Sequence, residues 1–278
     1  MALLSGNRGK VSVTSSVDLS VNEAFLSVLT TCIEDNAKSS GRKPSNSYTP
    51  SGMNCIRQMY YKRISTPQDP EVTAYNDIGM ADTGTRRHEA IQLALQYMNE
   101  AGKRFKYIDV TMYVNKRKEQ GRCASLVIQG KDGAETRLWD KNRDIKFRCD
   151  GIIYDSVTKY FYLFEFKNQI SFKASGKETV DEAHFSQIIA YCALLELDAA
   201  LVCYENRDNC DLYCPKAFIV SDYDKQMILS KIDECESYAK KTEVPPITTN
   251  LAPSDCKYCN YRRTCAYDQR ERGRNGES

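Results

Sequence analysis

Two β-rich segments joined by a short polar turn constrain the fold of this chain more than any other feature. Residues 145–154 and 160–168 are rich in β-branched and aromatic side chains, and the sequence DSVTK separates them. This pattern predicts an antiparallel β-hairpin. Both segments carry charged residues inside apolar sequence. These residues need an explanation, because burying a charge is costly unless it is paired or binds a metal.

The charged residues of the hairpin are expected to gather on one side. Glu165 and Lys167 are two apart, so they share one face of an extended strand, while Phe164 and Phe166 occupy the other. Asp150 on the preceding strand adds a second carboxylate. A hard cation such as Mg²⁺ or Mn²⁺ prefers this oxygen-rich setting. The alternative is a Glu–Lys ion pair at a sheet edge, with Asp150 in a turn.

Apolar periodicity and β-favouring composition predict the remaining elements. Asp82 or Thr83 is expected to cap the third helix and Gly102 to end it. The basic sequence NKRKEQGR is expected to be a turn between the first two strands. The element order predicts an α/β (α+β) fold with a mixed sheet flanked by helices. Helices are expected at residues 21–36, 51–63, 82–101, 180–197 and 223–241, and strands at 107–114, 125–129, 199–204 and 217–220.

Composition indicates a globular protein but does not indicate what it binds. The chain has 278 residues, 41% of them hydrophobic and 27% charged, which is typical of a globular protein. Its net charge of +2 neither requires nor excludes nucleic acid. No segment is long and apolar enough to cross a membrane, and the first ten residues lack a signal core. We therefore expect a cytoplasmic protein, or one in the host cytoplasm if a virus encodes it.

Cysteine usage points to metal ligation. In an intracellular protein the twelve cysteines would stay mostly reduced, so metal binding by a subset is expected rather than a disulfide framework. Cys256, Cys259 and Cys265 follow the spacing C-x2-C-x5-C, which supplies three ligands of a four-cysteine site. The fourth ligand must come from elsewhere in the chain. Spacing alone does not separate zinc from an iron–sulfur cluster.

The order of polar residues resembles one nuclease family. His88, Asp150, the Glu165-x-Lys167 triplet and a Gln187-x-x-x-Tyr191 pair follow each other in the chain. This order resembles the RecB-like branch of the PD-(D/E)xK nuclease superfamily. The resemblance implies a restriction-endonuclease-like fold and hydrolysis of phosphodiester bonds in DNA with Mg²⁺ or Mn²⁺.

The same resemblance implies a role for each residue. Asp150 and Glu165 would be the principal metal ligands, and His88 and the backbone carbonyl of Phe166 would complete the set. Lys167 would orient or deprotonate the attacking water, or stabilise the developing negative charge. Gln187 and Tyr191, on one face of a helix, would hold Lys167 and contact the DNA backbone.

A second resemblance concerns the cysteines. The segment around Cys55 carries Ser51, Cys55, Arg57, Tyr60 and Tyr61 at the spacing S-x-x-x-C-x-R-x-x-Y-Y. It resembles the iron–sulfur nucleases of the Cas-four and AddB type, in which one upstream and three downstream cysteines hold a [4Fe–4S] cluster. The resemblance implies a cluster that joins the N- and C-terminal segments, with zinc as the alternative.

Taken together, these patterns predict a DNA exonuclease that acts on ends or single strands. The resemblance covers residues 48–265, so we expect an N-terminal helical extension at 1–47 and a nuclease domain at 48–278, with the cysteine region at 245–278. Recombination, repair, CRISPR adaptation and viral DNA processing all use such enzymes, some within protein complexes. The main alternative is a catalytically idle DNA-binding or scaffold protein, and an RNA-directed nuclease is a third possibility. Oligomeric state is left open.

Overall fold

The computed structural model describes residues 19–39, 45–69, 75–99, 104–133, 135–169, 179–248, 251, 256–257 and 259–274. The chain divides into two compact units, Met1–Arg42 with Thr73–Met80, and Lys43–Val72 with Ala81–Ser278. The helix α1 (Leu19–Ser39) belongs to the first unit. Among the described residues, no helix combines the length and the apolar character that crossing a membrane requires.

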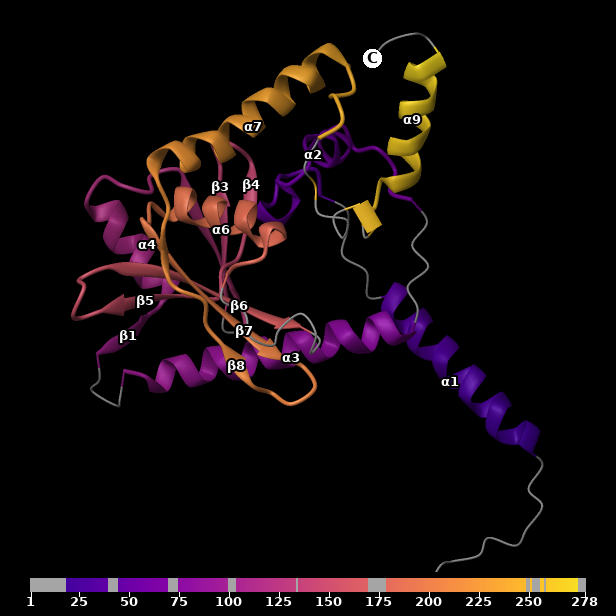
Figure 1. The fold of residues 1–278 in the computed structure, drawn as a ribbon, viewed down its shortest axis with the longest axis horizontal. Helices are drawn as coiled ribbons and strands as arrows, with labels where there is room; N and C mark the ends of the chain where they lie inside the picture. The colour runs from indigo at the N-terminus through magenta and orange to yellow at the C-terminus, as the bar shows by residue number, and fades with distance from the viewer. Residues whose placement is uncertain are drawn as a thin grey trace, which may run out of the picture. The chain divides into compact units, whose positions relative to one another are not determined.

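A six-stranded mixed sheet organises the second unit (Figure 1). Strands β6 and β7 are parallel, and every other pair in this sheet is antiparallel. The predicted mixed sheet is therefore confirmed, and so is the hairpin, which is formed by β5 and β6. The strand order is β1 (Phe105–Ile108), β5 (Gly151–Asp155), β6 (Phe161–Gln169), β7 (Ala199–Asn206) and β8 (Leu212–Tyr213), with β9 (Phe218–Ile219) also paired to β7.

A smaller antiparallel sheet contains β2 (Leu126–Asp132), β3 (Glu135–Asp140) and β4 (Ile145–Phe147). The prediction of one continuous strand over 145–154 is wrong, because its first part belongs to this sheet and its last part to the large one. The chain changes sheets at residues 148–150. Gly151 then lies so close to the Tyr107 ring that a Cβ atom would be 2.8 Å from it, so a side chain at this position would force the ring to move.

The described helices of the second unit correct two sequence predictions. Residues 107–114 are not one strand, because β1 ends at Ile108 and Asp109 starts a helix by accepting a hydrogen bond from Met112 N at 3.1 Å. The first five residues of the sequence predicted as a turn, 115–119, belong to that helix, where positive charge suits the helix dipole, and the turn begins only at Gln120. The helices are α2 (Ile56–Arg63), α3 (Tyr75–Tyr97, shared with the first unit), α4 (Val110–Glu119), α6 (Glu182–Leu195), α7 (Asp222–Lys241) and α9 (Arg262–Arg274).

Helix α3 begins and ends earlier than predicted. Asp82 and Thr83 lie inside it and do not cap it, because the residues before them continue the helix from Tyr75. The predicted end, Gly102, lies outside the described residues. The helices predicted at 21–36, 180–197 and 223–241 are confirmed as α1, α6 and α7, whereas only the second part of 51–63 is α-helical, after a 3₁₀ turn at Pro50–Gly52.

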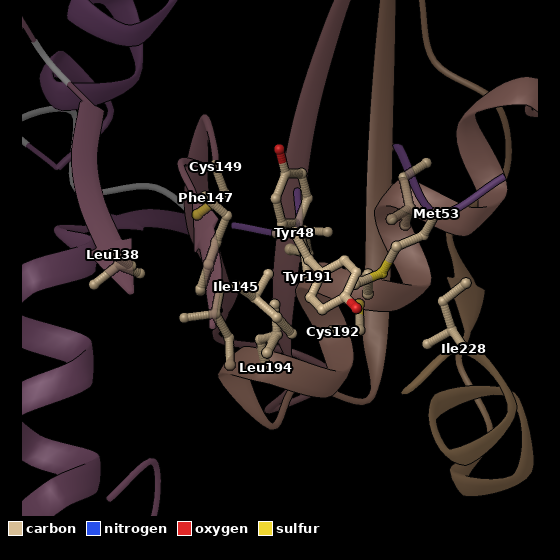
Figure 2. Close-up of a cluster of buried hydrophobic side chains, with 14 of the residues drawn as sticks. Tyr48, Met53, Leu138, Ile145, Phe147, Cys149, Tyr191, Cys192, Leu194 and Ile228 are labelled. Carbon is tan, nitrogen blue, oxygen red and sulfur yellow. The ribbon is translucent and has the colours of Figure 1, made fainter. Parts of the chain in front are cut away.

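The two faces of the large sheet pack against different helices (Figure 1). On one face, side chains such as Leu163 and Val202 join the main core with residues of α6 and α7, including Ile188 and Ile228; Figure 2 shows part of this core. On the other face a smaller cluster packs against α3. It contains Leu95, Tyr107, Ile153, Phe164 and Phe166. Strand β6 therefore alternates as predicted.

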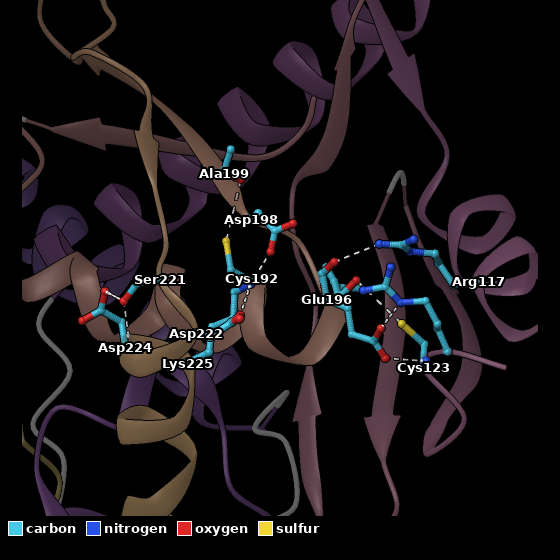
Figure 3. A network of polar contacts seen from close by, with 12 residues as sticks. Arg117, Cys123, Cys192, Glu196, Asp198, Ala199, Ser221, Asp222, Asp224 and Lys225 are labelled. Atoms are coloured by element: carbon cyan, nitrogen blue, oxygen red, sulfur yellow. Dashed lines mark hydrogen bonds and ion pairs between the residues drawn. The ribbon is translucent and has the colours of Figure 1, made fainter. Parts of the chain in front are cut away.

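Polar contacts fix the end of α6 and the start of α7 (Figure 3). Glu196 has a left-handed backbone at the end of α6, its carbonyl accepts from Arg117 at 3.0 Å, and its carboxylate accepts from Cys123 N at 2.7 Å. Ser221 caps α7 by accepting from Asp224 N at 3.1 Å. The contacts of Glu196 tie down the C-terminal end of α6, the helix that carries Gln187 and Tyr191.

Candidate active site

The site begins where strand β6 extends beyond its partner β5. The pairing of the two strands stops at Gly151 opposite Phe164. Past this point the side chain of Asp150 takes the place of a strand partner, because its Oδ2 accepts a hydrogen bond from Phe166 N at 2.6 Å. The carbonyl of a strand residue points to the same edge as its N–H group, so the Phe166 carbonyl faces this edge as well.

Helix α3 contributes His88 to the same carboxylate. His88 Nδ1 lies 3.1 Å from Asp150 Oδ1, and the imidazole packs edge-on against the Phe166 ring at 5.0 Å between centroids. Gln92, one turn later on the same helix face, donates to Asp150 Oδ1 at 3.4 Å. Burial by itself would lower the pKa of His88, but the hydrogen bond and negative charge of Asp150 outweigh it and raise the pKa.

On the opposite face of β6, Lys167 is held between a carboxylate and an amide. Its Nζ donates to Glu165 Oε1 at 2.7 Å and to Gln187 Oε1 at 3.0 Å. The Gln187 amide nitrogen donates in turn to Glu165 Oε1 at 3.1 Å and to the Tyr191 hydroxyl at 2.9 Å. The side chains of Glu165, Lys167, Gln187 and Tyr191 therefore form one connected network.

One oxygen of this network has no partner. Glu165 is 4% exposed, and its Oε2 is buried without a hydrogen-bond donor among the described residues. Burial and the negative charge of Asp150 raise the pKa of Glu165 to about 7. Buried carboxylate oxygens are normally satisfied by donors or by cations. The donor set therefore fits a divalent cation.

Sequence reasoning missed Glu135. This residue starts β3, and together with His88 and Asp150 it offers three ligand atoms that all lie within 4.8 Å of one another. Burial raises the pKa of Glu135, the nearby Arg148 lowers it, and Asp150 raises it further. Nothing in the sequence DGAETRLW marks Glu135, because only tertiary packing brings it to the site. Gln92, by contrast, had a signal, since it lies four residues after His88.

A second missed group fastens α3 to the large sheet. Glu205 on β7 is 1% exposed and accepts from Arg87 Nε at 2.8 Å and from Asn168 Nδ2 at 2.8 Å. Arg87 precedes His88, and Asn168 follows Lys167. This buried carboxylate therefore ties the histidine helix to the strand that carries the Glu-x-Lys triplet.

The alternative explanation of the triplet describes part of this arrangement. Glu165 and Lys167 do form an ion pair, and they lie where β6 extends beyond its last residue paired with β5. Asp150 lies in a bend before β5. The ion pair leaves Glu165 Oε2 without a donor among the described residues. Six of the predicted side chains lie on three neighbouring parts of the fold: His88 on α3, Asp150, Glu165 and Lys167 at the hairpin, and Gln187 and Tyr191 on α6.

The four predicted cysteines also come together. Cys55 precedes α2, Cys265 lies on α9, and with Cys256 and Cys259 they line one cavity of about 230 Å³. Among the described residues, no three cysteine sulfurs lie within 4.8 Å of one another.

Arg57 belongs to the same cavity. Its side chain is buried and donates from Nε to the Pro245 carbonyl at 2.7 Å, and its guanidinium lies 3.5 Å from Cys265 Sγ. A buried guanidinium beside these sulfur atoms can offset the negative charge that cysteine ligands bring to a metal. The chemistry of this cavity therefore fits a metal held by thiolates.

Comparisons with known proteins give no family for the chain. No family model matches it, and no curated protein matches it. Several solved structures are similar to it, including the following two. The crystal structure of SSO0001 shares 15% identity with a TM-score of 0.43, covering 87% of this chain and 96% of that one. The structure of LHK-Exo in complex with dAMP shares 12% identity with a TM-score of 0.42, covering 71% and 89%. At these scores the case for function rests on the residues themselves.

Proposed function

We propose that this chain is a metal-dependent nuclease that hydrolyses phosphodiester bonds in DNA. The observation that supports this most directly is the buried Glu165, whose Oε2 has no donor among the described residues while Lys167 binds its other oxygen. A structural ion pair would not require a bare carboxylate oxygen beside a second carboxylate, Asp150. A cation bound there would satisfy that oxygen and offset the two negative charges.

Asp150 and Glu165 are the proposed principal ligands, with His88 and the Phe166 carbonyl completing the set. When bound, the metal supplies Lewis acidity and lowers the pKa of a water molecule. The protein supplies the remaining chemistry. We assign Lys167 to orienting or deprotonating the attacking water or to stabilising negative charge on the phosphate, and Gln187 and Tyr191 to holding Lys167 and contacting the DNA backbone.

The finer proposal is an exonuclease that acts on DNA ends or on single strands. It rests on the sequence resemblance to RecB-like nucleases over residues 48–265. The same resemblance supports the proposal that Cys55, Cys256, Cys259 and Cys265 hold a [4Fe–4S] cluster.

The test is degradation of end-labelled single- and double-stranded DNA in Mg²⁺ or Mn²⁺. Wild-type protein is expected to release labelled products, and Glu165→Ala or Lys167→Ala to reduce the rate by about 10²- to 10⁴-fold. Lys225→Ala is the matched control, because Lys225 is another half-buried lysine paired with a carboxylate, Asp198 (Figure 3). It should leave the rate unchanged.

Each other outcome identifies a different function. A wild-type protein that binds DNA without cleaving it would be an idle scaffold. Cleavage of RNA in place of DNA would make it an RNA-directed nuclease. Equal activity in wild type, Glu165→Ala and Lys167→Ala would overturn the assigned site.

A further inference from the structure

Two cavities that share lining residues lie between α2 and the segment before α9. Their volumes are about 200 Å³ and 210 Å³, and both are lined by Lys62, Gln68 and Tyr261. The residues assigned above to the carboxylate site around Asp150 and Glu165 lie in the described part of the chain, and none of them lines either cavity. We propose that the two cavities form a binding site for a phosphate group, carried by a free nucleotide or by a nucleic-acid strand. This inference goes beyond the proposed function and does not depend on it.

The first argument is the chemistry of the lining. Among the described residues, Lys62 is the one charged side chain that lines the two cavities, and no aspartate or glutamate does so. Serine, threonine, asparagine and glutamine make up most of the rest, including Thr49, Ser65 and Gln68. These side chains carry donors for the oxygens of a phosphate, and lysine is a common binder of this group. Such a lining suits an anion.

The second argument is that Lys62 has no carboxylate partner among the described residues. Its Nζ donates to the Thr49 hydroxyl at 3.3 Å, a long hydrogen bond to a neutral acceptor. The next residue, Arg63, engages two acidic groups, at 2.9 Å from Asp144 Oδ2 and 2.6 Å from Glu236 Oε1. Charged groups that are partly buried are normally paired. Lys62 therefore carries a charge that a bound anion would neutralise.

A second lysine strengthens this argument. Lys146 on β4 is exposed and forms no ion pair with a described residue. Burial lowers the pKa of Lys62, the charge of Asp144 raises it, and the charge of Lys146 lowers it again, with a fall as the result. An anion beside Lys62 would oppose this fall, because negative charge favours the protonated ammonium group. The positive charges of both lysines therefore favour an anion at this position.

Contacts within the protein hold both walls of the site in place. Asp69, in the segment after α2, donates from its backbone N to the Asn260 carbonyl at 2.7 Å, and its carboxylate accepts from Arg263 N at 2.6 Å. Tyr261 packs against Tyr61 of α2, with 5.6 Å between the ring centroids. The segment after α2 is thereby joined to the start of α9. A site with fixed walls binds its ligand at a smaller entropic cost.

A purely structural lysine is the competing explanation for Lys62. Lys231 of α7 is such a lysine, because it is also half-buried, burial lowers its pKa, and its Nζ donates to the Met53 carbonyl at 3.0 Å. Lys231 lines neither cavity. It therefore serves as the matched control, since it shares the burial and the lowered pKa of Lys62 but not its surroundings.

The experiment is a calorimetric titration of the full-length protein with inorganic phosphate, deoxyadenosine monophosphate and a short 5′-hydroxyl oligodeoxynucleotide. Divalent cations are left out, so that the carboxylate site does not bind phosphate through a metal. Wild type and Lys231→Met should bind at least one of these probes with equal affinity. Lys62→Met should bind it at least about tenfold more weakly, through loss of a charge-assisted hydrogen bond. Thermal unfolding checks that each variant is folded.

Chemical labelling of the wild-type protein gives a test that needs no variant. Acetylation of each lysine is followed by mass spectrometry, with and without the probe. At a probe concentration of about ten times Kd, acetylation of Lys62 should slow about tenfold, because only about a tenth of the sites stay free. Acetylation of Lys231 should not change.

The probes identify the source of the phosphate. Protection of Lys62 by inorganic phosphate or by the mononucleotide assigns the site to a free nucleotide, and protection by the oligonucleotide alone assigns it to a strand. Unchanged affinity in Lys62→Met overturns the phosphate site. Equal acetylation of Lys62 with and without every probe overturns it as well.

The outcomes also separate this inference from the proposed function. A protein that binds phosphate at Lys62 but cleaves no nucleic acid retains this site and loses the proposed function. A protein that degrades DNA while no probe protects Lys62 remains a nuclease and loses this site.

Discussion

The carboxylate site and the cysteine cavity differ in how far the protein alone prepares them for a metal. At the carboxylate site, Asp150 and Glu165 are already held by protein donors, namely Phe166 N, Gln92, Lys167 and Gln187. In the cysteine cavity, four cysteines outside any disulfide surround a space of about 230 Å³, and the buried Arg57 lies beside one of them, Cys265. Protein hydrogen bonds hold the carboxylates of the first site, whereas the cysteines of the second line a cavity large enough for a metal group.

This difference predicts different consequences of losing the metal. A site whose ligands are fixed by hydrogen bonds keeps its geometry when the ion leaves, so metal removal affects catalysis more than folding. A site that joins distant segments through metal bonds contributes directly to the free energy of folding. The predictions below test this contrast, beginning with the largest expected effect.

Loss of a cysteine ligand is expected to destabilise the protein most. Cys256→Ala should remove the brown colour of the proposed cluster and lower Tm by about 10 °C, since losing a structural metal typically costs several kcal/mol. Absorption spectra, iron analysis and thermal unfolding measure this. Cys32→Ala, which changes an exposed cysteine on α1, should alter neither the colour nor the Tm of the protein. A colourless wild-type protein with stoichiometric zinc would contradict the cluster.

Gln187→Met is expected to damage catalysis without comparable loss of stability. It removes the acceptor for Lys167 and a donor to Glu165, so kcat should fall about 10- to 100-fold with little change in KM. Steady-state kinetics and Tm are the measurements. The same exchange at the exposed Gln226 of α7 is the control. A fall in Tm as large as that of Cys256→Ala would contradict the expectation that the carboxylate site matters more for catalysis than for folding.

Tyr191→Phe should have a smaller effect of the same kind. The variant loses the hydroxyl that accepts from Gln187 at 2.9 Å, so kcat should fall about three- to tenfold. Tyr113→Phe removes another buried hydroxyl, which donates to the Leu195 carbonyl at 3.2 Å outside the site. Kinetics should separate the two variants, and an equal loss of kcat in both would mean that Tyr191 acts only through packing.

The smallest expected effect concerns Asp155, a buried carboxylate whose oxygens both accept hydrogen bonds from protein donors. It accepts from Arg104 at 2.7 Å, Val157 N at 2.9 Å and Thr158 at 2.9 Å. The hydrogen bonds from Arg104, acting against burial, lower the pKa of Asp155 well below its usual range. The ionised form therefore stabilises the fold at neutral pH. This stabilisation is lost as pH falls from about 4, the unfolded value, through the folded pKa.

Asp155→Asn should consequently lower Tm by a few degrees at pH 7, and the gap to wild type should close below about pH 4. Thermal unfolding across this pH range measures the effect. Asp222→Asn, in an exposed pair, serves as the control. A gap that stays constant with pH would show that the charge of Asp155 is not what stabilises the fold.

Sequence predictions mostly succeeded where the structure depends on neighbouring residues and failed where it depends on contacts between distant ones. The alternation of β6 was predictable because side chains on a strand alternate with a period of two. The strand predicted at 107–114 was wrong because Asp109, a capping residue, outweighs the β propensity of the residues after it. No sequence feature predicted the break between β4 and β5, because it arises only when these neighbouring segments pair with strands of two different sheets.

By itself, the sequence determined the hairpin, the shared face of Glu165 and Lys167, and the helix that carries Gln187 and Tyr191. All of these depend on local periodicity and short turns. Tertiary structure alone decided that Asp150 replaces a strand partner of Phe166 and that Glu135 joins His88. The meeting of Cys55 with the C-terminal cysteines was predicted by the resemblance and not by any local pattern. Contacts between residues far apart in the chain depend on how whole elements pack, and no local pattern encodes that packing.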